Sequence, residues 1–119
     1  MIKTIEQKRA AHALKKVQSV RSGKDFVSLA SGLPTMIHTN GLGQAIAFCE
    51  GKSEKQYQEI VEMLADWLCS EERPFNGFDK EHILDAITSS SMETYMLAQV
   101  EAMAYLLWVK KFAKALIGD

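Results

Sequence analysis

A chain of 119 residues is long enough to bury one hydrophobic core, and we expect a single helical domain over residues 1–119. With 47% hydrophobic residues, 24% charged residues and a net charge of -1, the composition excludes a disordered chain, and the total charge indicates no class of partner. No apolar run approaches the roughly eighteen residues that cross a bilayer, and residues 1–16 lack the apolar segment of a secretory signal. We therefore expect a cytoplasmic protein with no membrane partner.

The first predicted element is an amphipathic helix that begins at a capping box. Thr4 and Gln7 have the spacing at which two side chains satisfy the first free backbone groups of a helix. Apolar residues then recur at helical intervals until Ser22 and Gly23 interrupt the pattern.

A sharp corner is predicted between a second helix, from about 25 to 39, and a third, from 42 to 50. Asn40 and Gly41 tolerate the left-handed conformation at which helices end, so together they predict the end of the second helix. Pro34 fits the first turn of a helix or a kink within it.

The third helix is predicted to pack closely against a neighbour. Gly43 has no side chain to keep the two elements apart, while Gln44 is expected to point outward. The expected apolar face consists of Leu42, Ala45, Ile46 and Phe48.

Two further helices are predicted in the middle of the chain. Ser53 with Gln56 forms a capping pattern for the fourth, and Asp79 is placed to cap the fifth. The loop between them is predicted from Pro74, Asn76 and Gly77.

The last and longest helix is predicted from Met92 to about Leu116, with a capping box of Ser90 and Glu93. It is apolar on nearly every side, so we expect it to be largely buried. It is either the central helix of a bundle or partly covered by another protein chain, with Trp108 as the anchor of that interface. The fold class is thus predicted to be all-α, a bundle of about six helices.

Charge is divided along the chain. Residues 1–24 hold seven Lys and Arg against one Glu, whereas residues 50–72 hold seven Asp and Glu against two Lys. Four basic residues of the first helix fall within an arc of about 120°, opposite its apolar stripe, and three near the C-terminus share another face. These residues are Lys8, Arg9, Lys15, Lys16, Lys110, Lys111 and Lys114. They form either a strip that binds nucleic-acid phosphates or an ordinary solvated face.

The acidic segment supplies the complementary surface. We expect it to face the basic first helix of a second copy, in a head-to-tail contact that extends into an open assembly. The candidate interface residues are Glu54, Glu59, Glu62 and Asp66.

No catalytic constellation emerges from the sequence. His12, His38 and His82 are scattered and lack the spacing of a zinc site. The glycines at 41 and 43 precede a helix, but no strand leads into them and no phosphate-binding lysine follows. We therefore predict no catalytic residue, no metal, no cofactor and no small-molecule substrate.

Two strings in this sequence carry a family resemblance. LPTMIHTNGLGQ at 33–44 and WVKKFAKAL at 108–116, with a basic first helix before them, resemble the small helical subunit of the type III-B CRISPR effector, the Cmr complex. The resemblance implies a non-catalytic, RNA-associated assembly subunit in antiviral defence, whose copies stack along the guide RNA and target RNA backbone beside other subunits of the complex. The alternative is a protein-only helical adaptor whose basic face binds an acidic protein.

Overall fold

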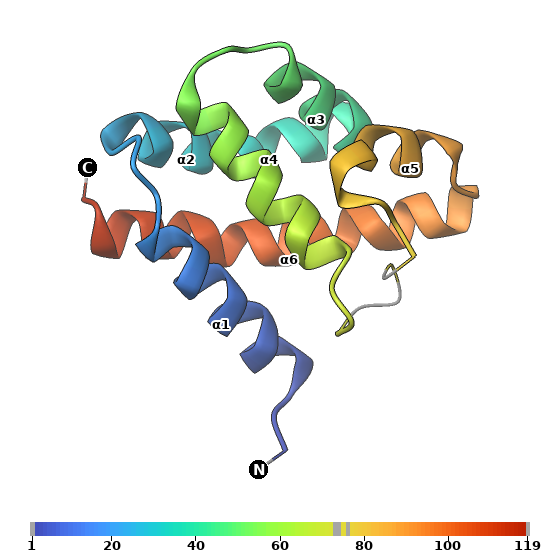
Figure 1. Cartoon of the computed structure of the whole chain (residues 1–119), viewed down its shortest axis with the longest axis horizontal. Coiled ribbons are helices and arrows are strands. Elements are labelled where there is room, and N and C mark those ends of the chain that lie inside the picture. The colour runs from blue at the N-terminus through green and yellow to red at the C-terminus, as the bar shows by residue number, and fades with distance from the viewer. Residues whose placement is uncertain (1, 73–74, 76, 119) are drawn as a thin grey trace.

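The computed structural model describes residues 2–72, 75 and 77–118, which form six α-helices, one short 3-10 helix and no strand (Figure 1). The predicted all-α class and the long C-terminal helix are confirmed. In chain order the elements are α1 (Ile5–Gln18), α2 (Lys24–Asn40), α3 (Leu42–Glu50), α4 (Lys55–Leu68), η1 (Lys80–His82), α5 (Ile83–Ser89) and α6 (Met92–Leu116). Over the described part of the chain, no helix is long and apolar enough to span a bilayer.

Helix α6 runs along the longest dimension of the molecule, and in Figure 1 helices α2 to α5 lie above it while α1 crosses it and extends below. Helices α1, α2 and α4 contact α6 directly, while α3 packs on α2 and α4. The helices share one hydrophobic core because each contributes an apolar stripe to the space between them. Its largest fully buried side chains include Trp67, Tyr105, Phe26, Ile37, Leu42, Ile60, Leu68, Ile87 and Leu106.

The start of α1 has the predicted cap. The Thr4 hydroxyl accepts a hydrogen bond from the Gln7 amide at 3.1 Å, and the Gln7 side chain accepts one from the Thr4 amide at 2.8 Å. The helix ends earlier than its apolar pattern predicted, at Gln18. Glu59 of α4 holds the loop that follows by accepting from the backbone amides of Arg21 and Ser22.

The corner between α2 and α3 depends on Gly41 alone. Gly41 has φ 92° and ψ 159°, whereas Asn40 is still part of α2 and no described residue other than glycine has a positive φ. Glycine adopts this conformation without steric strain because it has no Cβ atom. The predicted end of the second helix at about residue 39 is one residue early, because Asn40 is still helical and Gly41 makes the turn. Pro34 lies inside α2, in a buried position.

Two side chains of α6 hold this corner in place. The Gly43 amide donates to the Tyr95 hydroxyl at 2.8 Å, and the Leu42 amide donates to Gln99 Oε1 at 2.9 Å. A Cβ on Gly43 would lie 3.3 Å from the Tyr95 hydroxyl, so the predicted close approach is confirmed. Gln44 is exposed, as predicted.

Several local predictions need correction. No side chain caps α4 at Ser53, because α4 begins one residue after Glu54. The cap of α6 is Ser91 rather than Ser90, with its hydroxyl accepting from the Thr94 amide at 3.1 Å. Asp79 caps η1 rather than α5 itself.

Phe48 is 41% exposed, because the buried position at that end of α3 is taken by Cys49. In the predicted loop, Pro74 and Asn76 lie outside the described residues.

Helix α6 is buried along one side but is not enclosed on every side within this chain. Helices α1, α2 and α4 cover only one side of α6, and the other side carries exposed apolar side chains. Trp108 is half-buried and stacks on Phe112 with ring centroids 5.4 Å apart. The exposed residues are Met92, Met96, Leu97, Val100, Leu107 and Leu116.

Candidate nucleic-acid interface

The basic arc of α1 lies beside the buried face of the helix and not opposite it. The residues of α1 that are buried are Ala13 and Val17. Arg9, His12 and Lys16 point toward the junction of α1 with α4 and α6, where each has a polar partner. The predicted apolar stripe included Ala13 and Val17, but its members Ala10 and Leu14 are only half-buried, so the buried face is turned toward Arg9 and Lys16.

Arg9 is bound within the protein. Its guanidinium donates from Nε to Glu101 Oε2 at 2.6 Å and from Nη2 to Glu101 Oε1 at 2.9 Å. Glu101 is 4% exposed and also accepts from the indole nitrogen of Trp67 at 2.8 Å. The hydrogen bond to Glu101 raises the pKa of Arg9. Both nitrogens of this fork are engaged, so the structure gives Arg9 the role of neutralising a buried carboxylate.

His12 links α1 to α4 and α6. Its Nδ1 lies 2.8 Å from the Tyr105 hydroxyl, and its Nε2 lies 2.7 Å from Asp66 Oδ2. Burial lowers the pKa of His12, although the hydrogen bond to Asp66 opposes this shift. A neutral imidazole that donates from Nε2 to Asp66 and accepts at Nδ1 from Tyr105 satisfies both contacts.

Asp66 is the centre of a small cluster of cations. Besides His12, it contacts Lys80 at 3.1 Å and Lys16 at 3.5 Å. Burial raises the pKa of Asp66, but the hydrogen bonds from His12 and Lys80 and the charge of Lys16 outweigh this effect and hold it at about 2. The carboxylate is therefore ionised at any physiological pH and connects α4 with α1 and η1.

The remaining lysines of the predicted strip are open to solvent to different degrees. Lys8 pairs with Glu72 at 2.8 Å, with both side chains more than 40% exposed. Lys15, Lys111 and Lys114 are exposed, and none of them forms an ion pair with another described residue. Lys110 is half-buried.

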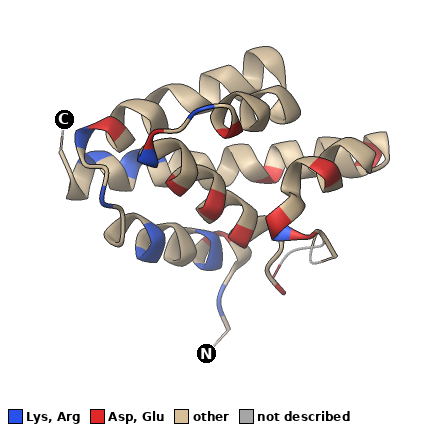
Figure 2. Cartoon of the chain, turned by 45° about the horizontal axis from the view of Figure 1, so that its top comes forward, with Lys and Arg blue, Asp and Glu red and all other residues tan. Residues whose placement is uncertain are grey.

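The two predicted basic faces belong to helices that pack against each other. A groove of about 380 Å³ separates α1 from the exposed side of α6, and Lys111 lies along it near Glu6 and Arg9. Figure 2 shows Lys and Arg gathered on α1 and near the C-terminal end of α6, whereas Asp and Glu predominate on α4. The division of charge along the sequence is thus also a division in space.

Half of the predicted acidic interface is used within the chain. Asp66 is paired as described, and Glu59 accepts from the Arg21 amide at 2.8 Å and from the Ser22 amide and hydroxyl. Glu54 and Glu62 are exposed. The complementary charges therefore meet inside one molecule first, which leaves fewer of them for a second copy.

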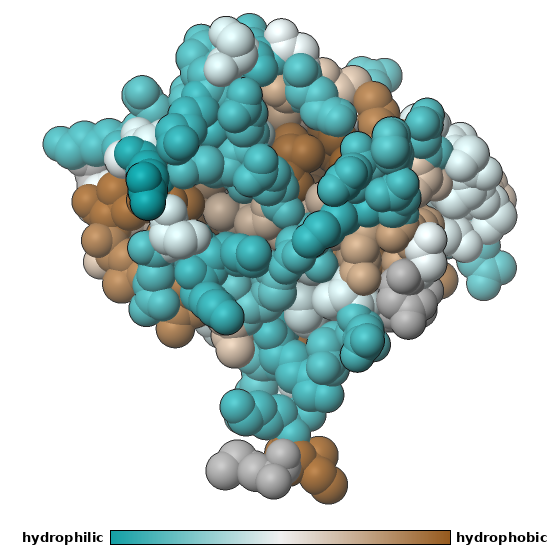
Figure 3. Space-filling model, in the orientation of Figure 1, coloured by the Kyte–Doolittle hydropathy of each residue, from teal (hydrophilic) through white to brown (hydrophobic). Residues whose placement is uncertain are grey.

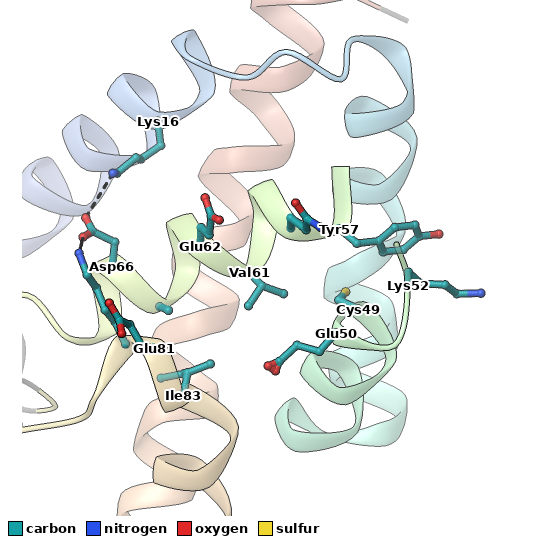
Figure 4. Close-up of a pocket in the computed structure, with 13 residues that line it drawn as sticks. Lys16, Cys49, Glu50, Lys52, Tyr57, Val61, Glu62, Asp66, Glu81 and Ile83 are labelled. Carbon is teal, nitrogen blue, oxygen red and sulfur yellow. Dashed lines mark hydrogen bonds and ion pairs between the residues drawn. The ribbon is translucent and has the colours of Figure 1, made fainter. Parts of the chain in front are cut away.

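A second groove, of about 670 Å³, lies between α3, α4 and the start of α5. Figure 3 shows it as a hollow with an apolar floor and a hydrophilic rim, and Figure 4 shows Val61 and Ile83 in it with Asp66 paired to Lys16 at one end. Burial raises the pKa of the Cys49 thiol there to about 11, so the thiol stays protonated and is a poor nucleophile at neutral pH.

The described residues also lack a cluster of side chains that could bind a metal ion. Within residues 2–72, 75 and 77–118, no three His, Cys, Asp or Glu side chains are placed to hold an ion. His38 is exposed, and His82 pairs with Asp79 at 2.7 Å.

Sequence reasoning missed the polar residues that organise this region. The sequence pattern assigns no polar role to Glu101, Trp67 or Tyr105, yet together with Arg9 and His12 they form the polar contacts between α1, α4 and α6. One signal was present, because Glu101 is an isolated acid in the middle of an apolar helix and such a residue requires a buried partner.

The fold and this surface define a small all-helical protein with a basic side built from its first and last helices and an acidic side built from its middle helices. A protein-family model described as "CRISPR-associated protein (Cas_Cmr5)" matches residues 5–116. The chain belongs to the Cmr5 family, the small subunits of the type III-B CRISPR Cmr complex.

Individual relatives agree with this assignment over nearly the whole chain. The "CRISPR system Cmr subunit Cmr5" of Thermus thermophilus is 27% identical over 122 residues, covering 99% of this chain and 100% of that protein. The protein of the same name from Thermotoga maritima is 27% identical over 119 residues, covering 98% of this chain and 88% of its own length. The crystal structure of a Cmr5 family protein from Thermus thermophilus matches with a TM-score of 0.83 and 25% identity, over 98% of this chain and 99% of that one.

Proposed function

We propose that this chain is a non-catalytic, RNA-associated assembly subunit of a type III-B CRISPR effector complex in antiviral defence. Its copies stack along the duplex of guide RNA and target RNA and contact the other Cmr subunits. Membership of the Cmr5 family over residues 5–116 supports the place in the complex. The observation that supports an RNA role is the set of exposed lysines Lys15, Lys111 and Lys114 on two adjoining helices.

Lysines in such a position recognise phosphates and not bases. Lys is a flexible point charge that suits a phosphate backbone, and sequence is read by base pairing between guide and target in RNA-guided systems. Lys8 and Lys16 extend the surface, because exposed ion pairs such as Lys8 with Glu72 contribute at most about 1 kcal/mol and exchange readily for a phosphate. Lys110 belongs to the same face of α6. Arg9, which is engaged by Glu101, holds α1 in place instead of contacting RNA.

The experiment compares two double variants of the subunit, each assembled into the complex with guide RNA. Lys111→Ala/Lys114→Ala removes charge from the basic side, and Lys52→Ala/Lys55→Ala removes the same charge from two exposed positions, one in the loop between α3 and α4 and one at the first residue of α4. Affinity for target RNA is measured across a salt series. The first variant should lower the slope of log affinity against log salt by roughly 0.7 to 0.9 for each lost phosphate contact, and the second should not.

Two other outcomes contradict the RNA role. Equal effects of the two variants would show that only total charge matters. Unchanged RNA affinity together with loss of the subunit from the complex would support the protein-only adaptor, whose basic side binds an acidic protein surface.

A further inference from the structure

The exposed side of α6 carries a regular apolar stripe. Met96 is 60% exposed, Val100 69% and Leu107 46%, and Met103 between them is half-buried. Their spacing of four, three and four residues is the spacing of the seam in a pair of coiled helices. Apolar side chains exposed in a continuous row on a small protein mark a surface that another molecule covers.

The same spacing continues into charged residues at both ends. Glu93 lies three residues before Met96, and Lys110 lies three residues after Leu107. Lys114 follows four residues later. The row therefore has an acidic start, an apolar middle and a basic end.

The row is symmetric about a point between residues 101 and 102. Met96 and Leu107 are equally distant from this point, and so are Val100 and Met103. Glu93 and Lys110 are equally distant as well, with opposite charge. A second α6 that crosses in the antiparallel direction at this point places Met96 beside Leu107, Val100 beside Met103 and Glu93 beside Lys110 of the other copy.

We propose that two copies of this chain pair through α6 in this antiparallel register, as a two-fold symmetric dimer. The parallel register is disfavoured because it places Glu93 beside Glu93 and Lys110 beside Lys110. The antiparallel register forms each contact twice, as an isologous interface requires. The pairing is a property of the free chain and is tested without RNA, although its basic end shares Lys110 and Lys114 with the proposed RNA surface.

A single helix pair buries less surface than a standard protein interface, so the dimer dissociates reversibly, with a dissociation constant on the order of 10 µM. Sedimentation equilibrium of the full chain without RNA measures this constant. Val100→Glu should make the protein monomeric, because it places a charge at the centre of the seam. Gln44→Glu, an exposed change on α3, is the matched control and should leave the dimer intact. Circular dichroism melts establish that both variants are folded.

A charge exchange tests the register. Glu93→Lys and Lys110→Glu should each weaken dimerisation, and the double variant should restore it, because the opposite charges again meet across the seam. A double variant that is as weak as the single ones would overturn the antiparallel register.

Cross-linking with a carbodiimide, which joins carboxylates directly to amines, is a second test of the antiparallel register. Glu93 and Lys110 are seventeen residues apart on one helix, or about 26 Å along its axis, so a direct link between them forms only between copies. When unlabelled and ¹⁵N-labelled protein are mixed, the cross-linked product of Glu93 and Lys110 should include species that join one unlabelled peptide to one labelled peptide. A folded protein that remains a monomer at about 1 mM, some hundredfold above the expected constant, would overturn the proposal and leave the row to another protein subunit.

Discussion

Glu101 brings a carboxylate into the core, where it contacts Arg9 of α1 and Trp67 of α4. A buried ion pair adds little stability compared with apolar residues of the same size, but removal of one partner leaves an uncompensated charge. The sequence pattern placed all four basic residues of the α1 arc opposite the core, where the fold would not depend on them, and this expectation is wrong at Arg9.

Arg9→Ala should lower the free energy of unfolding by about 3 kcal/mol, whereas Lys15→Ala should change it by less than about 0.5 kcal/mol. Urea unfolding of the two variants measures the difference. Arg9→Met combined with Glu101→Leu should recover most of the loss, because it removes both charges. Equal stability of the two alanine variants would show that the carboxylate of Glu101 does not need Arg9.

His12 makes stability depend on pH. Because burial lowers its pKa from the usual 6.5, the folded state binds fewer protons than the unfolded state, and the contribution of His12 is present above pH 6.5 and lost below it. Between pH 7.5 and 5.5, wild-type protein should lose more stability in urea than His12→Gln. The pKa of His82 is raised by Asp79, which gives the opposite slope, but His82 is common to both proteins and cancels in the comparison. Parallel pH profiles would contradict this role for His12.

Among the helices, some of the predictions that depend on neighbouring residues were accurate. The cap of α1, the corner at Gly41 and the extent of α6 follow from local conformational preferences and from apolar periodicity. The cap of α6 was misplaced by one residue because Ser90 and Ser91 have the same chemistry, and only the tertiary path of the chain selects between them.

The candidate site was less accessible to sequence reasoning. The contacts of Arg9 with Glu101 and of His12 with Asp66 join residues far apart in the chain, and no local pattern specifies such pairs. A helical wheel finds the basic arc of α1, but the direction of burial is determined by the helices that pack against it.

A pair of glycines tests the corner. Gly41→Ala should destabilise the protein by about 1 to 3 kcal/mol, because alanine is strained at φ 92° and its Cβ would lie 3.2 Å from the Tyr95 hydroxyl. Gly32→Ala is the matched control, since Gly32 is helical with open space around it, and should stabilise by roughly 0.5 to 1 kcal/mol. If the melting temperatures of both variants shift in the same direction, the corner does not require glycine.

The molecule as a whole combines a divided surface charge with ion pairs that cross between its helices. Lys8 reaches Glu72 and Lys16 reaches Asp66, so the basic first helix is attracted to the acidic middle helices of the same chain. A head-to-tail contact between copies through these charges would have to compete with the internal pairs.

The purified protein should not cleave RNA, with or without divalent metal. This expectation follows from the proposed non-catalytic role, and burial raises the pKa of the Cys49 thiol to about 11, which makes it a poor nucleophile. Incubation of labelled RNA with the protein in Mg²⁺, Mn²⁺ and a chelator measures this. Cleavage that copurifies with the protein and disappears in a surface variant would contradict a non-catalytic role.

The lysines of the proposed RNA surface come from α1, which precedes every other helix in the described chain, and from α6, which follows them all. During synthesis the first half of this surface leaves the ribosome long before the second half exists. The surface is complete only after α6 has emerged and docked beneath α1. A chain that stops before α6 would therefore lack the α6 half of the proposed RNA surface.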